Sequence, residues 1–327
     1  MVEDLQKELE IWLRPLVYEE ERSSLDEKLA QIAEAELQIE QGDFTDVFAF
    51  YIRFAKDEVC FLPVARCALL GAIGNNAPVL FAQVWKDLQN YPTWCKRPWA
   101  TCGTDLLKMW VCHVLHVQLD GDDQVDLPDI SHLPREWRAL AIYVEMLLCR
   151  NRGDFQSGYF SGRTILNLEC GLPENGLLDL YLKRTHAQFC QELGKKDERE
   201  HWFRKMTEES CEHGWVRPFL GLSFSNRSCL MKVLSEQSNP LHNKVKKATK
   251  GYLQALVRFH NQIAKEHLVE NLTPREFYVA AALKRGCSYK EIARNMGVSI
   301  GRVNILVCSI YTSLNIHSRT ELEPLVW

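Results

Sequence analysis

Apolar residues recur with helical spacing from the start of the chain. Leu5, Leu9, Trp12 and Leu16 are separated by three or four positions, so they fall on one face of a first helix. Similar spacing continues along most of the chain, and no segment shows the alternation of apolar and polar residues that is typical of a β-strand. The pattern therefore predicts an all-α fold.

Polar turns that contain glycine interrupt this pattern at intervals of 32 to 47 residues. The turns begin at Gly42, Gly74, Gly121, Gly153 and Gly194. Two of them are near copies, since QIEQGDFTDVFAFY and CRNRGDFQSGYFSG share Gly-Asp-Phe followed by aromatic residues. A repeated unit of helix, turn and helix resembles a tetratricopeptide-like array, although no unit carries the full pattern of that repeat. We expect such a helical sensor or interaction domain over 1–240.

The character of the chain changes after the turn residues Ser238, Asn239 and Pro240. Apolar residues between Val245 and Ile263 then share one helical face, and several lysines lie at its beginning. This pattern predicts a connecting helix within residues 241–269, which joins the body to the tail.

The tail carries the clearest helix-start signals. Three capping boxes, in which a hydroxyl residue precedes Glu by three positions, are predicted at Thr273–Glu276, Ser288–Glu291 and Ser318–Glu321. Gly297 suits the end of a helix because glycine readily adopts positive φ, and Ser299 suits the cap of the next helix. Four short helices are therefore expected in the tail.

The second and third of these helices are expected at Tyr289–Met296 and Ser299–Ser313, with Gly297 and Val298 between them. This is the spacing of a helix-turn-helix, whose second helix enters the major groove of DNA while the first braces it over the backbone. Residues 270–327 accordingly resemble the LuxR-type DNA-binding domain of bacterial transcription regulators. The resemblance is carried by Leu272, Thr273, Arg275, Glu276, Val279, Gly286, Ser288, Lys290, Glu291, Ile292, Ala293, Ser299, Gly301, Val303, Ile310, Leu314, Arg319, Glu321 and Leu322.

The resemblance implies a DNA-reading surface on the third helix. Where the family usually has Thr-Val-Lys-x-His, this chain has RVNIL at 302–306, and Arg302 is the only charged residue of that helix. Asn304 suits the edge of an adenine, and Lys290, at the start of the bracing helix, suits a phosphate. The side chains of Ile305, Leu306 and Cys308 are expected on the exposed side. The expected DNA-binding residues are Lys290, Ser299, Arg302, Val303 and Asn304.

A second resemblance concerns the end of the body. CEHGWVRPFLGL, residues 211–222, is similar to the close of the helical array in the MalT-like subgroup of these regulators. Members of that subgroup place tetratricopeptide-like repeats before a LuxR-type tail, which implies a sensing array that controls DNA binding. They usually begin with an ATPase module, but this chain contains no GxxxxGK[ST] sequence.

Charge is unevenly distributed along the chain. Residues 271–327 contain seven Lys or Arg and four Asp or Glu, a net charge of +3. The other residues contain 39 − 7 = 32 basic and 43 − 4 = 39 acidic side chains, a net charge of −7. A basic tail on an acidic body favours contact with double-stranded DNA through the tail alone.

Other chemistry is weakly represented. The twelve cysteines form no CxxC pair and are expected to be free thiols. No uninterrupted apolar run approaches the roughly 18 residues of a membrane span, so a cytoplasmic protein without membrane contact is expected. Two further clusters suit either core packing or a site: His113, His116 and Asp120 for a metal, and Trp94, Trp99 and Trp110 for a ligand pocket. We expect no catalysis, no cofactor and no metal.

The sequence favours a transcription regulator in which a small-molecule or protein effector of the body controls the tail. The alternative is an interaction protein, an anti-regulator, whose degenerate helix-turn-helix serves packing or dimerisation. The fourth tail helix is expected to be a single turn because Pro324 follows so closely. Any homodimer is therefore expected to form through the body or the connecting helix.

Overall fold

The computed structural model of the chain is helical throughout its described part. The described residues are 2–16, 22–43, 45–115, 127–134, 137–167, 176–265, 268–270 and 272–326. No strand occurs within these ranges, which confirms the all-α prediction.

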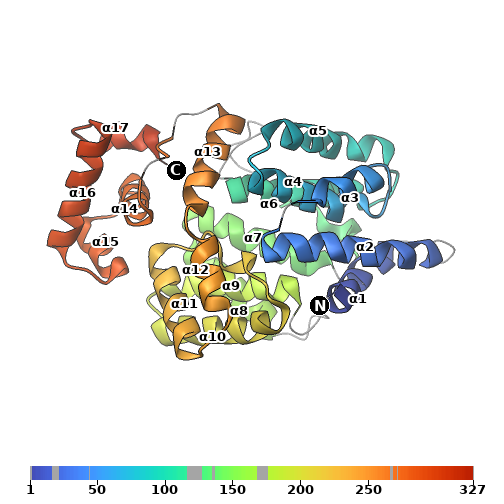
Figure 1. Ribbon diagram of the computed structural model, residues 1–327, viewed down its shortest axis with the longest axis horizontal. Coiled ribbons are helices and arrows are strands. Elements are labelled where there is room, and N and C mark those ends of the chain that lie inside the picture. Colours follow the sequence, from blue (N-terminus) through green and yellow to red (C-terminus); the bar gives the residue numbers. More distant parts are fainter. Residues whose placement is uncertain are drawn as a thin grey trace.

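The body consists of helices that run side by side (Figure 1), and several consecutive pairs, such as α7 with α8 and α9 with α10, are joined by short turns. Consecutive helices pack on each other, as α1 does on α2, α4 on α5, and α9 on α10. This arrangement fits a helical-repeat body. The bounds are α1 Val2–Leu13, α2 Arg22–Gln41, α3 Val47–Phe54, α4 Phe61–Gly74, α5 Pro78–Trp94, α6 Ala100–Leu115, α7 Arg138–Arg152, α8 Phe155–Asn167, α9 Leu177–Glu192, α10 Lys196–His213 and α11 Phe224–Glu236, with 3-10 turns at Arg14–Leu16, Ile130–His132 and Arg217–Phe219.

Glycine ends several helices where the sequence predicts a turn. Gly153 follows α7 and Gly194 follows α9, each with a φ of 74°. This left-handed conformation suits glycine because it has no Cβ to clash with the backbone. At the turn predicted from Gly74, Asn76 adopts positive φ instead, at 51°. The turn predicted at Gly121 lies outside the described residues.

The segment after the body's last hairpin packs into the body. It forms α12 (Leu241–Ala248) and α13 (Tyr252–Ala264), which Gly251 separates with a φ of 78°. The structure thus differs from the prediction of one connecting helix within 241–269. α13 contacts α4 and α5, and its His260 ring nitrogen Nδ1 lies 2.8 Å from the carbonyl oxygen of Leu115.

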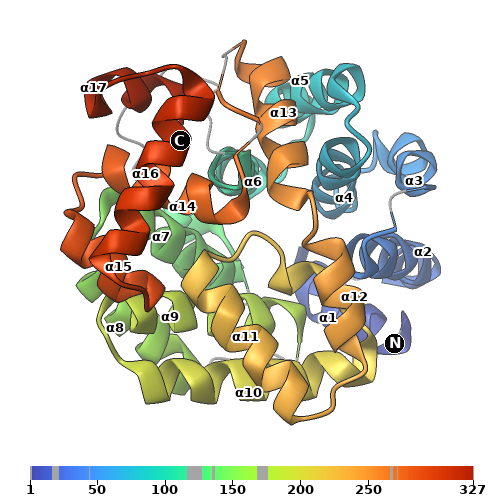
Figure 2. The same cartoon turned by 60° about the vertical axis from the view of Figure 1, so that its left-hand side comes forward.

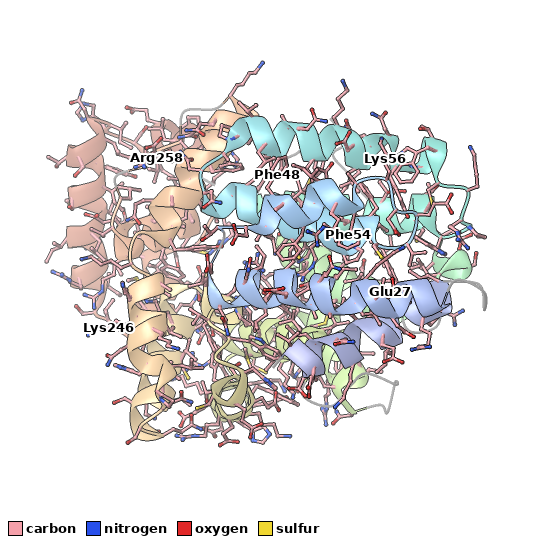
Figure 3. All side chains as sticks on the ribbon, turned by 45° about the vertical axis from the view of Figure 1, so that its right-hand side comes forward. Glu27, Phe48, Phe54, Lys56, Lys246 and Arg258 are labelled. Atoms are coloured by element: carbon pink, nitrogen blue, oxygen red, sulfur yellow. The ribbon has the colours of Figure 1, made fainter. Side chains whose placement is uncertain are left out.

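α13 also forms hydrogen bonds and an ion pair with the segment that leads into the tail. The side chain of Asn261 bonds both the N–H and the C=O of Leu268, at 2.8 and 2.9 Å. Gln254 donates to the carbonyl oxygen of Leu272 at 3.1 Å. Arg258, labelled on α13 in Figure 3, forms an ion pair of 3.3 Å with Glu270. These contacts fix the entry to the tail against the body.

The tail is a small helical unit (Figure 2), and its apolar residues form a core of their own. Apolar residues from each of its helices, among them Val279, Ile292, Val307 and Leu322, are fully or almost fully buried together. The unit contacts the body where α14 and α15 meet α11. Its bounds are α14 Pro274–Lys284, α15 Tyr289–Met296, α16 Ile300–Leu314 and α17 Arg319–Leu322, followed by a 3-10 turn at Glu323–Leu325.

Candidate nucleic-acid interface

Two reciprocal capping boxes fix the starts of the first two tail helices. The Thr273 hydroxyl accepts from the N–H of Glu276 at 3.3 Å, and the Glu276 carboxylate accepts from the N–H of Thr273 at 2.9 Å. Ser288 and Glu291 repeat this arrangement at the start of α15, at 3.3 and 2.7 Å. Both boxes confirm the sequence prediction. Each satisfies backbone donors that a helix start otherwise leaves unpaired.

The third predicted box forms only in part. The Ser318 hydroxyl accepts from the N–H of Glu321 at 3.3 Å, as expected. The Glu321 carboxylate, however, accepts from the N–H of His317 and not from that of Ser318. The backbone of Ser318 is extended, with a φ of −143°, and the box pattern in the sequence does not specify that conformation.

A tight turn joins the two helices of the helix-turn-helix. Gly297 ends α15 with a φ of 66°, and the N–H of Val298 bonds the carbonyl oxygen of Ala293 at 3.0 Å. The Ser299 hydroxyl then caps α16 by accepting from the N–H of Arg302 at 3.2 Å. The chain bends by 107° between the two helices. The sequence therefore specified both helices and the turn between them.

The structure places four of the five predicted DNA-binding residues on the surface. Lys290, Ser299, Arg302 and Asn304 are exposed, in the first turn of α15, in the first two turns of α16 or at the α16 cap. Val303 differs, because its side chain is 0% exposed within the tail core and leaves no surface for DNA. It supports α16 from beneath.

The exposed side of α16 also differs in part from the prediction. Leu306 was expected to face solvent, but it is buried, because position 306 lies three residues from Val303 and four from Ile310 on the core face. Ile305 is 58% exposed, and Cys308 is exposed as expected. Sequence reasoning missed Ile300, which is 48% exposed in the first turn, although the Ser299 cap already placed it there.

The carboxylates of the caps are held in their ionised form. Partial burial alone would raise the pKa of Glu276, but hydrogen bonds from Thr273 and from Ser309 of α16 bring it below its ordinary value. Hydrogen bonds from the backbone and hydroxyl of Ser288 lower the pKa of Glu291. Both helix starts are therefore fully capped near neutral pH.

The predicted DNA-facing side of α16 is directed away from the body. α16 packs on α14 and α15, and it lies on the outer side of the tail in Figure 1. α14 and α15 carry the contact with α11. On the body side, burial raises the pKa of Glu192 at the end of α9, and the charge of Arg285 in the tail opposes that rise. The exposed first turn of α16 is thus accessible in the full chain.

Comparison with known proteins identifies this part of the chain. Residues 270–325 match the family model of bacterial regulatory proteins of the luxR family (GerE). These residues form a luxR-family helix-turn-helix domain. Domains of this family act in DNA-binding transcription regulation, and the helical body lies outside the matched residues. Neither a curated protein nor a solved structure matches the chain.

Other predicted features have mixed outcomes. The eleven cysteines within the described ranges are free, and most are buried. Of the candidate metal residues, His116 and Asp120 lie outside the described residues. Trp94 and Trp99 pack with Tyr91, at ring-centroid distances of 5.0 and 6.2 Å. Within the described ranges no single helix is long and apolar enough to cross a membrane.

Proposed function

We propose that this chain is a DNA-binding transcription regulator in which an effector of the helical body controls the tail. The match of residues 270–325 to the luxR family carries the proposal. The two capped helices and the exposed first turn of α16 support it, because a recognition helix needs a fixed angle and an accessible N-terminal end. The proposal involves no catalytic step and no cofactor.

Four residues form the proposed DNA contact. Arg302 supplies the positive charge of α16, and Asn304 supplies an amide that suits the edge of an adenine. Lys290, at the start of α15, is assigned to a phosphate. The Ser299 cap orients the first turn of α16. Since Arg302 is the only charge on this helix, we expect modest affinity and a shallow dependence on salt.

One observation favours a second candidate function. Ile300 and Ile305 are 48% and 58% exposed on the helix that is expected to face DNA. Exposed apolar side chains on an interacting helix suit a protein surface better than a phosphate backbone. The second candidate is therefore an interaction protein that binds other regulators through α16 and does not bind DNA.

A mobility-shift experiment separates the two functions. The full chain is incubated with a pool of random duplexes at low and moderate salt, and bound duplexes are sequenced. Enrichment of one sequence supports the regulator, whereas absence of binding at low salt supports the interaction protein.

The first prediction concerns Arg302. Arg302→Ala is expected to weaken binding to a selected duplex by about 1–3 kcal/mol, because it removes the only charge of the recognition helix. Arg138→Ala is the matched control, since Arg138 is an exposed arginine on α7 of the body. Equal binding by both variants would contradict the assignment of α16 to DNA.

A further inference from the structure

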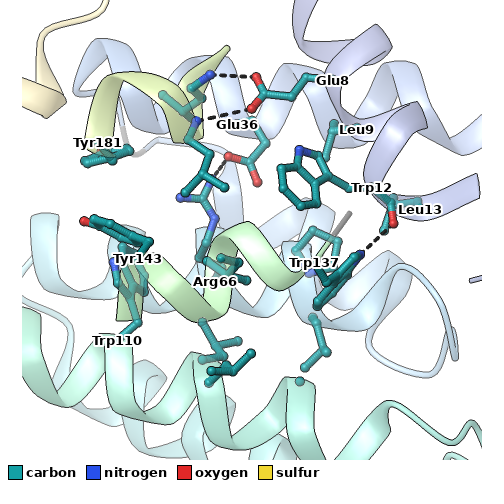
Figure 4. A pocket seen from close by; sticks show the side chains of 18 of the residues that line it. Glu8, Leu9, Trp12, Leu13, Glu36, Arg66, Trp110, Trp137, Tyr143 and Tyr181 are labelled. Atoms are coloured by element: carbon teal, nitrogen blue, oxygen red, sulfur yellow. Dashed lines mark hydrogen bonds and ion pairs between the residues drawn. The ribbon is translucent and has the colours of Figure 1, made fainter. Parts of the chain in front are cut away.

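A pocket lies inside the body where helices α1, α2, α4, α6, α7 and α9 converge (Figure 4). Its volume is about 170 Å³. Most of its wall is apolar, with Leu5 and Leu9 on one side and Leu106 and Leu140 among those on the others. Trp110, which the sequence left between core packing and a ligand pocket, also lines it and is 7% exposed.

One end of the pocket carries a buried carboxylate. Glu8 of α1 is 8% exposed and accepts from the N–H groups of Leu177 and Leu178 at 2.8 and 3.3 Å. It thereby caps the start of α9, as the dashed lines in Figure 4 show. Burial raises the pKa of Glu8, and the Trp12 side chain is a third hydrogen-bond partner that opposes this rise. A carboxylate has about four acceptor positions, so about one of them remains beside the apolar wall.

The positive charge in the lining is already neutralised. Arg66 is the one cation among the described residues that line the pocket. It forms an ion pair with Glu36, and its guanidinium lies 3.7 Å from a carboxylate oxygen of Glu40. The guanidinium carbon is also 5.7 Å from the centre of the Trp110 ring. An anionic ligand would therefore meet the carboxylates of Glu8 and Glu36 without a spare cation.

Size and chemistry together define the ligand. An apolar cavity of about 150 Å³ holds benzene, so this pocket has room for one ring with a small substituent. A donor on that substituent has an acceptor in Glu8, while an added negative charge would be desolvated without a partner. We propose that the pocket binds a neutral, single-ring molecule that carries one hydrogen-bond donor, of which phenol is the simplest form.

Helix α9 connects this pocket with the DNA-binding tail. It begins at the pocket with Leu177, Leu178 and Tyr181, and it contacts α11, which in turn contacts α14 and α15 of the tail. A ligand that shares the acceptor Glu8 acts on the cap of α9, and α9 transmits that change to the tail. This effector role rests on the proposed function, whereas binding in the pocket does not.

Calorimetry on the full chain tests the pocket with three probes of similar size. Phenol is expected to bind saturably with one site per chain. Benzoate is expected to bind at least about tenfold more weakly, since it brings an unpaired negative charge to the carboxylates. Toluene, which lacks the donor, is also expected to bind more weakly than phenol. Equal or tighter binding of benzoate or toluene would overturn the proposed ligand class.

Two leucine-to-tryptophan variants, one inside the pocket lining and one outside it, test the location of the site. Leu140→Trp places a larger side chain at a half-buried position of the lining and is expected to weaken phenol binding by about tenfold or more. Leu166→Trp makes the same change at a half-buried position of α8 outside the lining and is expected to bind like the parent. Unchanged binding by Leu140→Trp would overturn the site. Thermal unfolding of both variants verifies that they are folded.

Mobility shifts with and without phenol keep the two proposals distinct. If the parent binds phenol and Leu140→Trp does not, the pocket is supported even when no duplex binds. In that case only the proposed function fails. Specific duplex binding without saturable phenol binding overturns the pocket alone. A change in duplex affinity with phenol, present in the parent and absent in Leu140→Trp, supports the effector role. If the chain binds both phenol and a specific duplex, but phenol leaves the duplex affinity unchanged, the effector role is overturned.

Discussion

Single positions on α16 decide how strongly the tail is expected to bind DNA. Ile305 is exposed next to Asn304, where a basic residue would approach a phosphate. Ile305→Lys is therefore expected to tighten binding and to steepen the salt dependence by about 0.9 in the log–log slope. The measurement is a titration of a selected duplex at several salt concentrations.

Ile52→Lys is the matched control for that substitution. Ile52 is 64% exposed on α3 of the body, so the new lysine adds the same charge far from α16 along the chain. Identical salt slopes for the parent and both variants would show that the Ile305 side of α16 does not meet DNA.

Residue-level prediction from the sequence was good for caps and poorer for the faces of α16. Caps are local, because Thr273 and Ser288 meet partners three residues away, so the sequence alone specifies them. Leu306 lies at the edge of the core face, three residues from Val303 and four from Ile310, so the rotation of the helix against α14 and α15 decides whether it is buried. An apolar helix with one charge offers little polar pattern from which to read that rotation.

At the scale of elements, the capping carboxylates link tail stability to pH. The pKa of Glu276 is lowered in the folded state, so its stabilising contribution is present above the unfolded pKa and is lost as the pH falls through the folded pKa. Glu276→Gln is expected to lower the unfolding temperature of the tail at about pH 6 and to have a smaller effect at about pH 4.

Thermal unfolding of the full chain at both pH values measures this difference. Glu34→Gln, at an exposed position in the middle of α2, is the control and is expected to leave the pH dependence unchanged. A Glu276→Gln effect of the same size at both pH values would mean that the side chain stabilises α14 by packing and not by its charge.

The break between α12 and α13 marks where prediction of elements failed. Apolar spacing runs on through 241–263, yet Gly251 adopts a positive φ and separates two helices. α13 then packs on α4 and α5, which lie about 170 to 200 positions earlier in the chain. Periodicity within a segment carries no information about such distant partners, so the segment was predicted as a straight connector.

At the scale of the whole molecule, the body fixes the position of the tail. Asn261 and Gln254 of α13 bond the chain at Leu268 and Leu272, and α14 and α15 contact α11. The first turn of α16 remains exposed in this arrangement. Under the proposed function, DNA would meet these exposed residues without release of the tail from the body, and regulation through α9 would act by changing the orientation of the tail.

Neither the internal pocket nor the docking of the tail could be located from the sequence, because both depend on contacts between helices that are far apart in the chain. Trp110 was recognised as a candidate, but its partners Glu8, Arg66 and Tyr143 come from α1, α4 and α7. The mixture of apolar wall and paired charges exists only once these helices converge. Sequence patterns located the DNA-binding end well because helix-turn-helix geometry is encoded within one short segment.

The short last helix of the tail limits how two copies of the chain could pair through the tail. α17 is one turn, Arg319–Leu322, and Pro324 lies in the 3-10 turn that follows, as the sequence predicted. Leu322 and Val326 are 0% exposed within the tail core, so neither is available to a second copy. This burial removes two of the apolar side chains with which the end could contribute to the roughly 1,000 Å² that a stable interface needs.

The isolated fragment 268–327 is therefore expected to be monomeric, and any dimer of the full chain is expected to form through the body or α12. The fragment keeps the tail core intact, including the bond from the N–H of Val269 to the carbonyl oxygen of Leu325 at 2.8 Å. Sedimentation of fragment and full chain at micromolar concentration measures both states, with circular dichroism to verify that the fragment is helical. A stable dimer of the folded fragment would show that another exposed face of the tail, such as that around Ile305, pairs two copies directly.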